Sequence, residues 1–292
     1  MRGRIPFLFV LLAAMLWGTT GTAQALAPAN AHPVSIGTMR MAIGGVFLII
    51  LTLFLKQFHL KNWPLKSLLV AIISMACYQP LFFSAVKTTG VAIGTVIAIG
   101  SAPILSGVLE GIFLKQLPKR KWWVATCFSI LGCMMLFVNA TTIHLDPIGM
   151  FLALGAGLSF ASYTLVSKRL VQVHKPLTVV AVVFTGSGLL LFPFLFIYDL
   201  SWVFTGNGII VSLHLGIVAT GIAYFLFVKG LIEVPSSSAV TLSLAEPMTA
   251  TVLGVLIVGE QLTVFSWIGL ALLVCGLVCL AVPKEAKLVK PS

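Results

Sequence analysis

Apolar residues dominate the chain in ten long runs, which short polar segments separate. Each run approaches the roughly 20 residues that an α-helix needs to cross about 30 Å of hydrocarbon. The runs cover residues 5–27, 34–55, 67–86, 91–114, 122–140, 148–167, 176–198, 209–228, 236–258 and 264–282. This pattern predicts an all-α polytopic membrane protein with ten transmembrane helices and no inserted soluble domain.

Composition supports the membrane assignment. Of the 292 residues, 59% are hydrophobic and 9% are charged, whereas about 25% are charged in a typical soluble domain. The mean hydropathy is +1.12. A soluble globular protein is therefore excluded.

The formal net charge of +11 is distributed unevenly along the chain. If the N-terminus lies in the cytoplasm, sixteen of the eighteen basic residues fall on that side: Arg2, Arg4, Lys56, Lys61, Lys66, Lys115, Lys119, Arg120, Lys121, Lys168, Arg169, Lys175, Lys229, Lys284, Lys287 and Lys290. The positive-inside rule then predicts a multi-pass protein of the cytoplasmic membrane with both termini inside. The basic excess reflects this topology and does not indicate a nucleic-acid partner.

The first run also resembles a cleavable signal peptide, because Arg2 and Arg4 precede it and Ala25-Leu26-Ala27 ends it. Cleavage would leave nine spans in the same orientation. We expect the segment to be retained, because an internal repeat requires it.

That repeat appears when the chain is aligned with itself at a shift of 143 to 145 positions. The shift pairs Trp17 with Phe160, Pro103 with Pro247, Gln116-Leu117 with Gln261-Leu262, Trp122 with Trp267, and Gly132 with Gly276. We predict five-helix repeats at 1–143 and 147–283, followed by a basic cytoplasmic tail at 284–292. Because five is odd, the second repeat is inverted, as in many secondary transporters. The alternative is a coincidental alignment of two helical membrane segments.

The matched prolines, Pro103 and Pro247, lie in mid-span. A proline inside a helix leaves the carbonyl four residues earlier without its donor, here Ile99 and Ser243. Such carbonyls are tolerated where they line a wet cavity. We predict that the two prolines are hinges; the alternative is a packing kink.

Glu246 stands at the centre of the uncharged run 236–258. A charge there costs about 2.5 kcal/mol or more, so it usually faces a cavity or a partner. Glu246 is either a proton-coupling or amine-binding carboxylate, or a neutral acid that stabilises the break at Pro247. Arg40 is predicted to be a structural anchor or the partner of an anionic group, and Glu110 a charge at a helix end.

Other intramembrane polar and aromatic side chains are candidates for a small-molecule pocket. The predicted substrate-binding set is Trp17, Tyr78, Gln79, Ser101, Tyr163, Tyr224 and Glu246. Helix packing is the alternative role for each of them.

Motifs for other chemistry are missing from the sequence. It contains no GxxxxGK[ST] loop, HExxH or GxSxG, so we expect no ATP hydrolysis and no cofactor. The five cysteines all lie in apolar runs without a CxxC pair, which predicts no disulfide and no metal site.

The stretch from Ser236 to Glu246-Pro247, then Gly259-Glu260-Gln261-Leu262-Thr263 and Trp267-Ile268-Gly269, resembles the EamA domain of the drug/metabolite transporter superfamily. Ser101-Ala102-Pro103, Leu16-Trp17-Gly18 and Met39-Arg40 extend the resemblance over nearly the whole chain as two tandem domains. Lys115-Gln116-Leu117-Pro118 departs from the usual Gly-Glu-x-Leu-Thr turn, so no role is expected for that turn. The resemblance implies a ten-helix transporter that moves small metabolites, often amino acids, frequently outward.

We therefore predict a secondary transporter, an exporter of amino acids or related compounds, that works by alternating access around a midplane cavity in the lipid bilayer. Transport is either proton-coupled through Glu246 or facilitated diffusion. The alternatives are an intramembrane enzyme that uses Glu246 as an acid or base, and a scaffold or sensor that does not transport.

Overall fold

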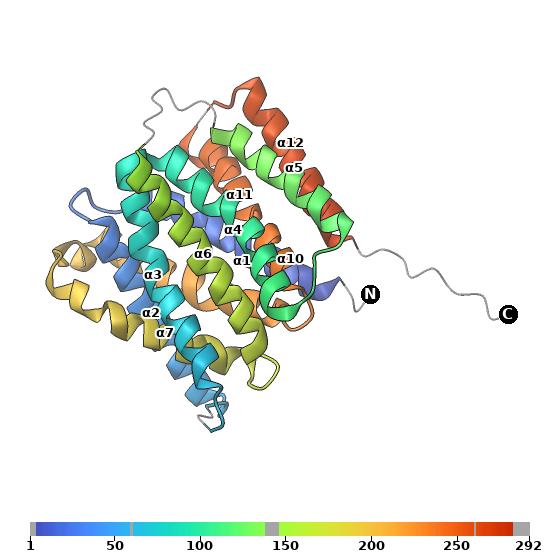
Figure 1. Cartoon of the computed structure of the whole chain (residues 1–292). Helices are drawn as coiled ribbons and strands as arrows, with labels where there is room; N and C mark the ends of the chain where they lie inside the picture. The colour runs from blue at the N-terminus through green and yellow to red at the C-terminus, as the bar shows by residue number, and fades with distance from the viewer. Residues whose placement is uncertain (1–3, 59–60, 138–145, 260, 283–292) are drawn as a thin grey trace.

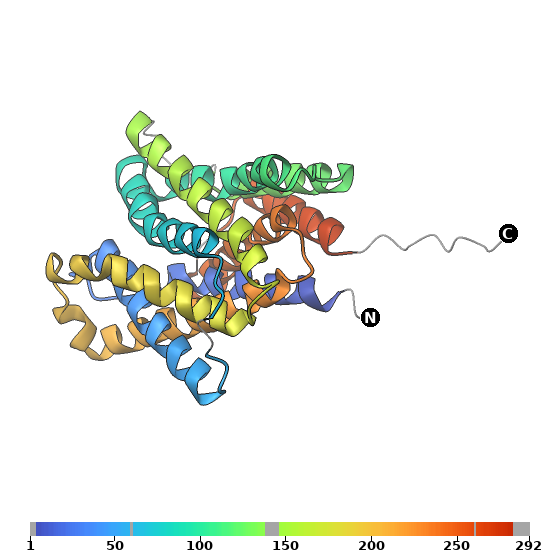
Figure 2. The same cartoon turned by 60° about the horizontal axis from the view of Figure 1, so that its bottom comes forward.

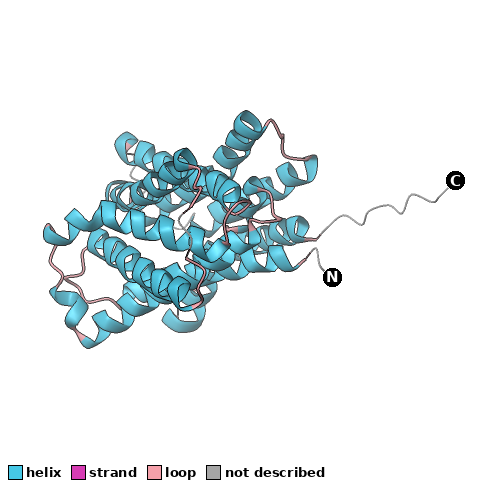
Figure 3. Ribbon diagram, turned by 90° about the horizontal axis from the view of Figure 1, so that it is seen from below, coloured by secondary structure: helices cyan, strands magenta, loops and turns pink. Residues whose placement is uncertain are grey.

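The computed structural model describes residues 4–58, 61–137, 146–259 and 261–282, and every regular element within these ranges is a helix (Figures 1 and 3). The elements are α1 (Ile5–Ala25), α2 (Pro33–Phe54), α3 (Leu65–Thr89), α4 (Val91–Leu114), α5 (Arg120–Phe137), α6 (Pro147–Leu170), α7 (Pro176–Leu191), η1 (Phe192–Phe196), η2 (Ser201–Phe204), α8 (Gly206–Leu213), η3 (His214–Ile222), α9 (Ala223–Gly230), α10 (Ser236–Leu242), α11 (Ala245–Leu253), η4 (Gly254–Val258) and α12 (Val264–Ala281). The predicted tail 284–292, the end of the first repeat at 138–143 and Glu260 lie outside the described residues.

Within the described ranges, nine helical segments are long and apolar enough to cross a membrane. Three of them are composite. α7 and η1 form one span, α8, η3 and α9 follow one another without a gap in the second, and α10, α11 and η4 share the third. The fifth predicted span corresponds to α5, which falls outside this set; it has 18 residues and starts with Arg120 and Lys121, which lower its hydropathy. The predicted all-α polytopic class is confirmed.

The helices begin where the polar segments end, and local chemistry explains several of these starts. Pro33, Pro147 and Pro176 each occupy the first helical position, where the missing N–H costs no hydrogen bond. The Asp146 carboxylate accepts a hydrogen bond from the Gly149 amide at 3.0 Å and caps α6.

The helices pack in a reciprocal scheme. α6 contacts both α3 and α4, while α1 contacts both α9 and α11. α5 lies beside α12 at one edge of the bundle and α2 lies beside α7 at the other (Figures 1 and 2). The first helix of each half thus inserts between the third and fourth spans of the other half, which brings α1 and α6 to the centre.

The two matched prolines occupy different local structures. α4 continues through Pro103 without interruption. In the other half the chain breaks between α10 and α11, and Pro247 lies in the first turn of α11. There the Ser243 carbonyl accepts a hydrogen bond from the Glu246 amide at 2.9 Å, so the break satisfies the carbonyl that Pro247 frees.

We call the end of the bundle where α1 begins and α12 ends the terminal end. The end where α1 stops and α2 starts is the distal end. The start of α1 and the end of α12 lie on the same side of the bundle (Figure 1).

Candidate functional site

A cavity of about 40 Å³ lies at the centre of the bundle, between α1, α2, α3, α4, α6, α9 and the α10–α11 break. Its wall includes five residues singled out from the sequence: Trp17, Arg40, Tyr78, Tyr224 and Glu246. This volume holds about three water molecules, at roughly 10–15 Å³ each. In this packing the cavity is far smaller than the roughly 300 Å³ at which small-molecule pockets begin.

Glu246 reaches the cavity from the first turn of α11, directly after the helix break. Its side chain is partly buried. No described residue donates a hydrogen bond to its carboxylate, and no ion pair within 4.0 Å joins it to another described residue. The acid is therefore available to a ligand in the cavity.

Arg40 approaches the same cavity from α2 and is 7% exposed. Its Nε donates to the Thr220 hydroxyl at 3.0 Å, and an Nη donates to the Ala219 carbonyl at 3.3 Å. Both acceptors belong to the π-helical segment η3, a type of irregularity that is frequent at functional sites. A guanidinium has five N–H donors, so three remain for another partner.

The two charges face one cavity without pairing. Arg40 and Glu246 interact electrostatically. They nevertheless form no ion pair within 4.0 Å of one another. A cationic and an anionic group held apart in this way match a ligand that carries both charges.

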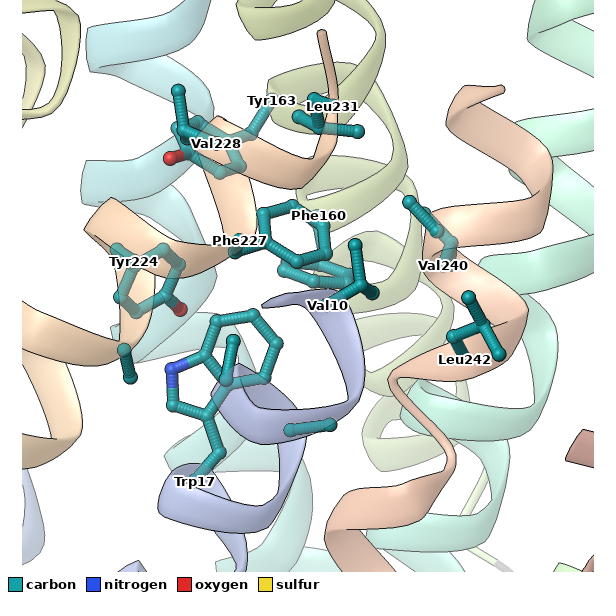
Figure 4. Close-up of a cluster of buried hydrophobic side chains, with 14 of the residues drawn as sticks. Val10, Trp17, Phe160, Tyr163, Tyr224, Phe227, Val228, Leu231, Val240 and Leu242 are labelled. Atoms are coloured by element: carbon teal, nitrogen blue, oxygen red, sulfur yellow. The ribbon is translucent and has the colours of Figure 1, made fainter. Parts of the chain in front are cut away.

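Aromatic rings also line the cavity, and Trp17, Phe160 and Tyr224 among them are drawn in Figure 4. The Trp17 ring lies 4.6 Å from the Tyr224 ring and 5.8 Å from the Phe160 ring, centroid to centroid. The indole N–H of Trp17 is buried and finds no acceptor among the described residues. Buried indole N–H groups usually have a partner, so this donor is a further candidate contact for a ligand.

Toward the terminal end, tightly packed side chains adjoin the cavity. Beyond Trp17, the fully buried side chains of Val10, Tyr163, Phe227 and Leu231 fill the space between the helices (Figure 4). We call this cluster of four side chains the aromatic plug.

Toward the distal end the site continues into a second cavity of about 370 Å³. The two cavities share Trp17, Thr20, Ile99 and Glu246. The larger one extends to Gln24 at the end of α1 and to Pro33 at the start of α2. Glu246 therefore borders a larger cavity toward the distal end, whereas the aromatic plug lies toward the terminal end.

Three of the predicted substrate-binding residues do not line the central cavity. Tyr163 lies within the aromatic plug. Gln79 is buried on α3 beside Gly37 of α2. The Ser101 hydroxyl bonds to the Ala98 carbonyl at 3.3 Å and packs against Gly157 of α6.

Ile99 and Ser243, whose carbonyls the two prolines were expected to free, both line the cavity. Thr20, which also lines it, and Thr220, which holds Arg40, were not predicted. Phe160 also lines the cavity. The internal repeat gave a signal for this residue, because Phe160 aligns with Trp17 and equivalent residues of two repeats meet where they lie on the two-fold axis between them.

Comparisons with known proteins agree with this architecture. The model of the EamA-like transporter family matches residues 4–138 and 147–282. A transporter of Bacillus subtilis (strain 168), YwfM, is 50% identical over 98% of this chain and 97% of its own. The threonine/homoserine exporter RhtA of Escherichia coli (strain K12) is 28% identical over 97% of this chain and 94% of its own. One solved crystal structure shares the fold with a TM-score of 0.83 and 21% identity, covering 94% of this chain and 95% of that one.

Proposed function

The chain belongs to the EamA-like transporter family, and from this premise we propose that it exports small zwitterionic amino acids, with L-threonine and L-homoserine as the first candidates. It is a transporter and not an enzyme, as the sequence predicted. The observation that carries the proposal is the unpaired Arg40 and Glu246 in one cavity. RhtA supplies the candidate substrates, since its name states that it exports threonine and homoserine.

Each charge has a defined role in this proposal. Arg40, oriented by Thr220 and Ala219, binds the substrate carboxylate through its free N–H groups. Glu246 binds the ammonium group. Trp17, Tyr78 and Tyr224 enclose the side chain, which explains why the pocket wall is aromatic around a charged centre.

Transport follows alternating access by two inverted five-helix halves, 1–143 and 147–283. The reciprocal insertion of α1 and α6 supports a two-fold relation between the halves. Under the positive-inside prediction the terminal end faces the cytoplasm, so the aromatic plug closes the cytoplasmic route and the 370 Å³ cavity opens outward. An exporter adopts such a state at substrate release.

The test is flux through purified protein in liposomes. Vesicles loaded with radiolabelled L-threonine or L-homoserine should lose label faster than protein-free vesicles, and excess unlabelled substrate should slow this loss. Two analogues separate the charges: the methyl ester of threonine lacks the carboxylate, and N-acetylthreonine lacks the ammonium group. Both should compete at least tenfold more weakly than threonine.

Variants connect each analogue to its residue. Arg40→Ala should weaken competition by threonine but leave competition by the methyl ester unchanged. Glu246→Gln should weaken competition by threonine but leave competition by N-acetylthreonine unchanged. The matched control is Glu233→Gln, which removes an exposed carboxylate in the α9–α10 turn. If the wild type carries no flux, or if both analogues compete as well as threonine, the zwitterion proposal is wrong.

A further inference from the structure

A second glutamate lies buried between the helices at the terminal end of the bundle. Glu110, near the end of α4, is 4% exposed and accepts a hydrogen bond from the Ser237 amide at 3.1 Å. It therefore contacts the start of α10 and is not the solvated helix-end charge that its sequence position suggests.

The Glu110 carboxylate is poorly satisfied for a buried acid. A carboxylate offers about four acceptor positions. Among the described residues, Ser237 is its one hydrogen-bond donor. Lys168 of α6 interacts with Glu110 electrostatically, yet its ammonium group donates to the Leu231 and Val234 carbonyls at 2.9 and 2.7 Å.

Glu110 also borders a cavity. A space of about 270 Å³ extends from it past Ser237, Ser238 and Trp122 to Leu280, near the end of α12. This volume approaches the roughly 300 Å³ at which small-molecule pockets begin. It shares no lining residue with the central cavity, so Glu110 and Glu246 face different spaces.

The face of α4 that carries Glu110 leads to the central cavity. Ala98 and Ala102 line that cavity, and Ser106 and Glu110 follow at four-residue intervals on the same face. Ala102 and Glu110 are about 12 Å apart along the helix. The Ser106 hydroxyl between them is buried without a partner among the described residues, as is the Ser236 hydroxyl at the start of α10. Unpaired polar atoms therefore mark the contact between α4 and α10.

We propose that Glu110 is a second ammonium-binding group, which a substrate amine meets at the terminal end before it reaches Glu246. This inference rests on the proposed export of amino compounds, because it assigns the first contact of the same substrate. Lys168 keeps the local charge balanced, so the site binds an ammonium ion weakly and releases it readily. The bond from Ser237 links the site to α10, since an ammonium ion that binds the carboxylate offsets its negative charge and weakens its hydrogen bond with that amide.

The first experiment measures the KM for L-threonine separately from each side. Inverted membrane vesicles expose the terminal end to the medium under the predicted topology, and right-side-out vesicles expose the distal end. Glu110→Gln should raise KM about tenfold from the terminal side and less than twofold from the distal side. The control Glu233→Gln should change neither value, while Glu110→Asp should restore most of the affinity. Equal effects of Glu110→Gln on both sides, or none on the terminal side, would overturn the proposal.

The second experiment does not depend on threonine flux. Methylammonium chloride should raise the melting temperature of detergent-purified Glu246→Gln relative to equal sodium chloride, because Glu110 remains. The double variant Glu110→Gln/Glu246→Gln should lose this shift. A shift that persists in the double variant refutes a site at Glu110 even where threonine is transported. A shift that depends on Glu110, in a protein that moves no threonine, supports the site and rejects the substrate.

Size-exclusion profiles establish that each variant is folded. If Glu110→Gln does not fold, Glu110→Asp replaces it and should reduce the shift without abolishing it.

Discussion

Gly18 offers a sharp test of the geometry at Glu246. It lies on α1, one residue after Trp17, where α1 crosses α11. A Cβ atom at Gly18 would stand 2.5 Å from the Thr249 Cβ and 2.7 Å from the Glu246 carbonyl oxygen. Since ordinary contacts begin near 3.4 Å, Gly18→Ala must push α1 and α11 apart by most of an ångström.

The expected cost follows from two opposing terms. Overpacking of a tight contact costs roughly 1–3 kcal/mol. Alanine in place of glycine returns about 0.5–1 kcal/mol within a helix. The net destabilisation of Gly18→Ala is therefore about 1 kcal/mol. Because the displaced atom belongs to the Glu246 peptide, the KM for export should rise together with the loss of stability.

The same helix supplies a matched control. A Cβ atom at Gly21 would meet nothing within 4 Å, so Gly21→Ala should be neutral or slightly stabilising. Melting of the purified variants in detergent, followed by tryptophan fluorescence, and liposome flux should separate the two substitutions. If Gly18→Ala melts and transports like Gly21→Ala, α1 does not approach Glu246 as closely as described.

Three further substitutions test the cavity. Glu246→Gln should reduce flux by about tenfold to a hundredfold, because a charged hydrogen bond of roughly 1.5–3 kcal/mol is lost. The proton dependence of flux tests coupling separately. If a proton gradient drives flux equally in the wild type and in Glu246→Gln, Glu246 is not the coupling group. Arg40→Lys keeps the charge but loses the guanidinium fork that reaches Thr220 and Ala219. The KM for threonine should therefore rise at least fivefold. An unchanged KM would show that Arg40 does not bind the substrate carboxylate. Trp17→Phe removes an indole N–H that has no acceptor among the described residues. The melting temperature should therefore change little, while the KM for threonine should rise about threefold. A large fall in melting temperature would instead indicate that the indole N–H has a structural partner.

The sequence predicted the helical class because a bilayer permits few alternatives. Backbone polar groups in hydrocarbon must be satisfied within the segment, so length and hydropathy suffice to place a helix. The position of Glu246 at a cavity could also be predicted, since intramembrane charges are costly away from a cavity or partner. Arg40 was expected to be an anchor or the partner of an anionic group, and it lines the same cavity.

The rotation of each helix was harder to predict. A helix that is apolar on all sides has no polar face to indicate its orientation. Tyr163 and Tyr224 illustrate the consequence, because both are aromatic, intramembrane and buried, yet Tyr224 lines the cavity and Tyr163 packs inside the plug. Glu110 was misjudged for a related reason: its distance from the helix end suggested solvent, but α10 covers it through Ser237.

If Glu110 binds the substrate amine as proposed, α10 is the element that would move when the terminal end opens. α10 has seven residues; Glu110 bonds to the amide near its start, and Glu246 follows its end by four residues. The break at Ser243 and Leu244 separates α10 from α11, so the short helix can tilt without displacing the rest of its span.

Val240 of α10 lines the central cavity, while Ser237 and Ser238 line the 270 Å³ cavity beside Glu110. A tilt of α10 that opens the contact with α4 would join the two cavities, and it requires release of the bond between Glu110 and Ser237. An ammonium ion at Glu110 favours that release, so substrate arrival itself would promote opening of the terminal end.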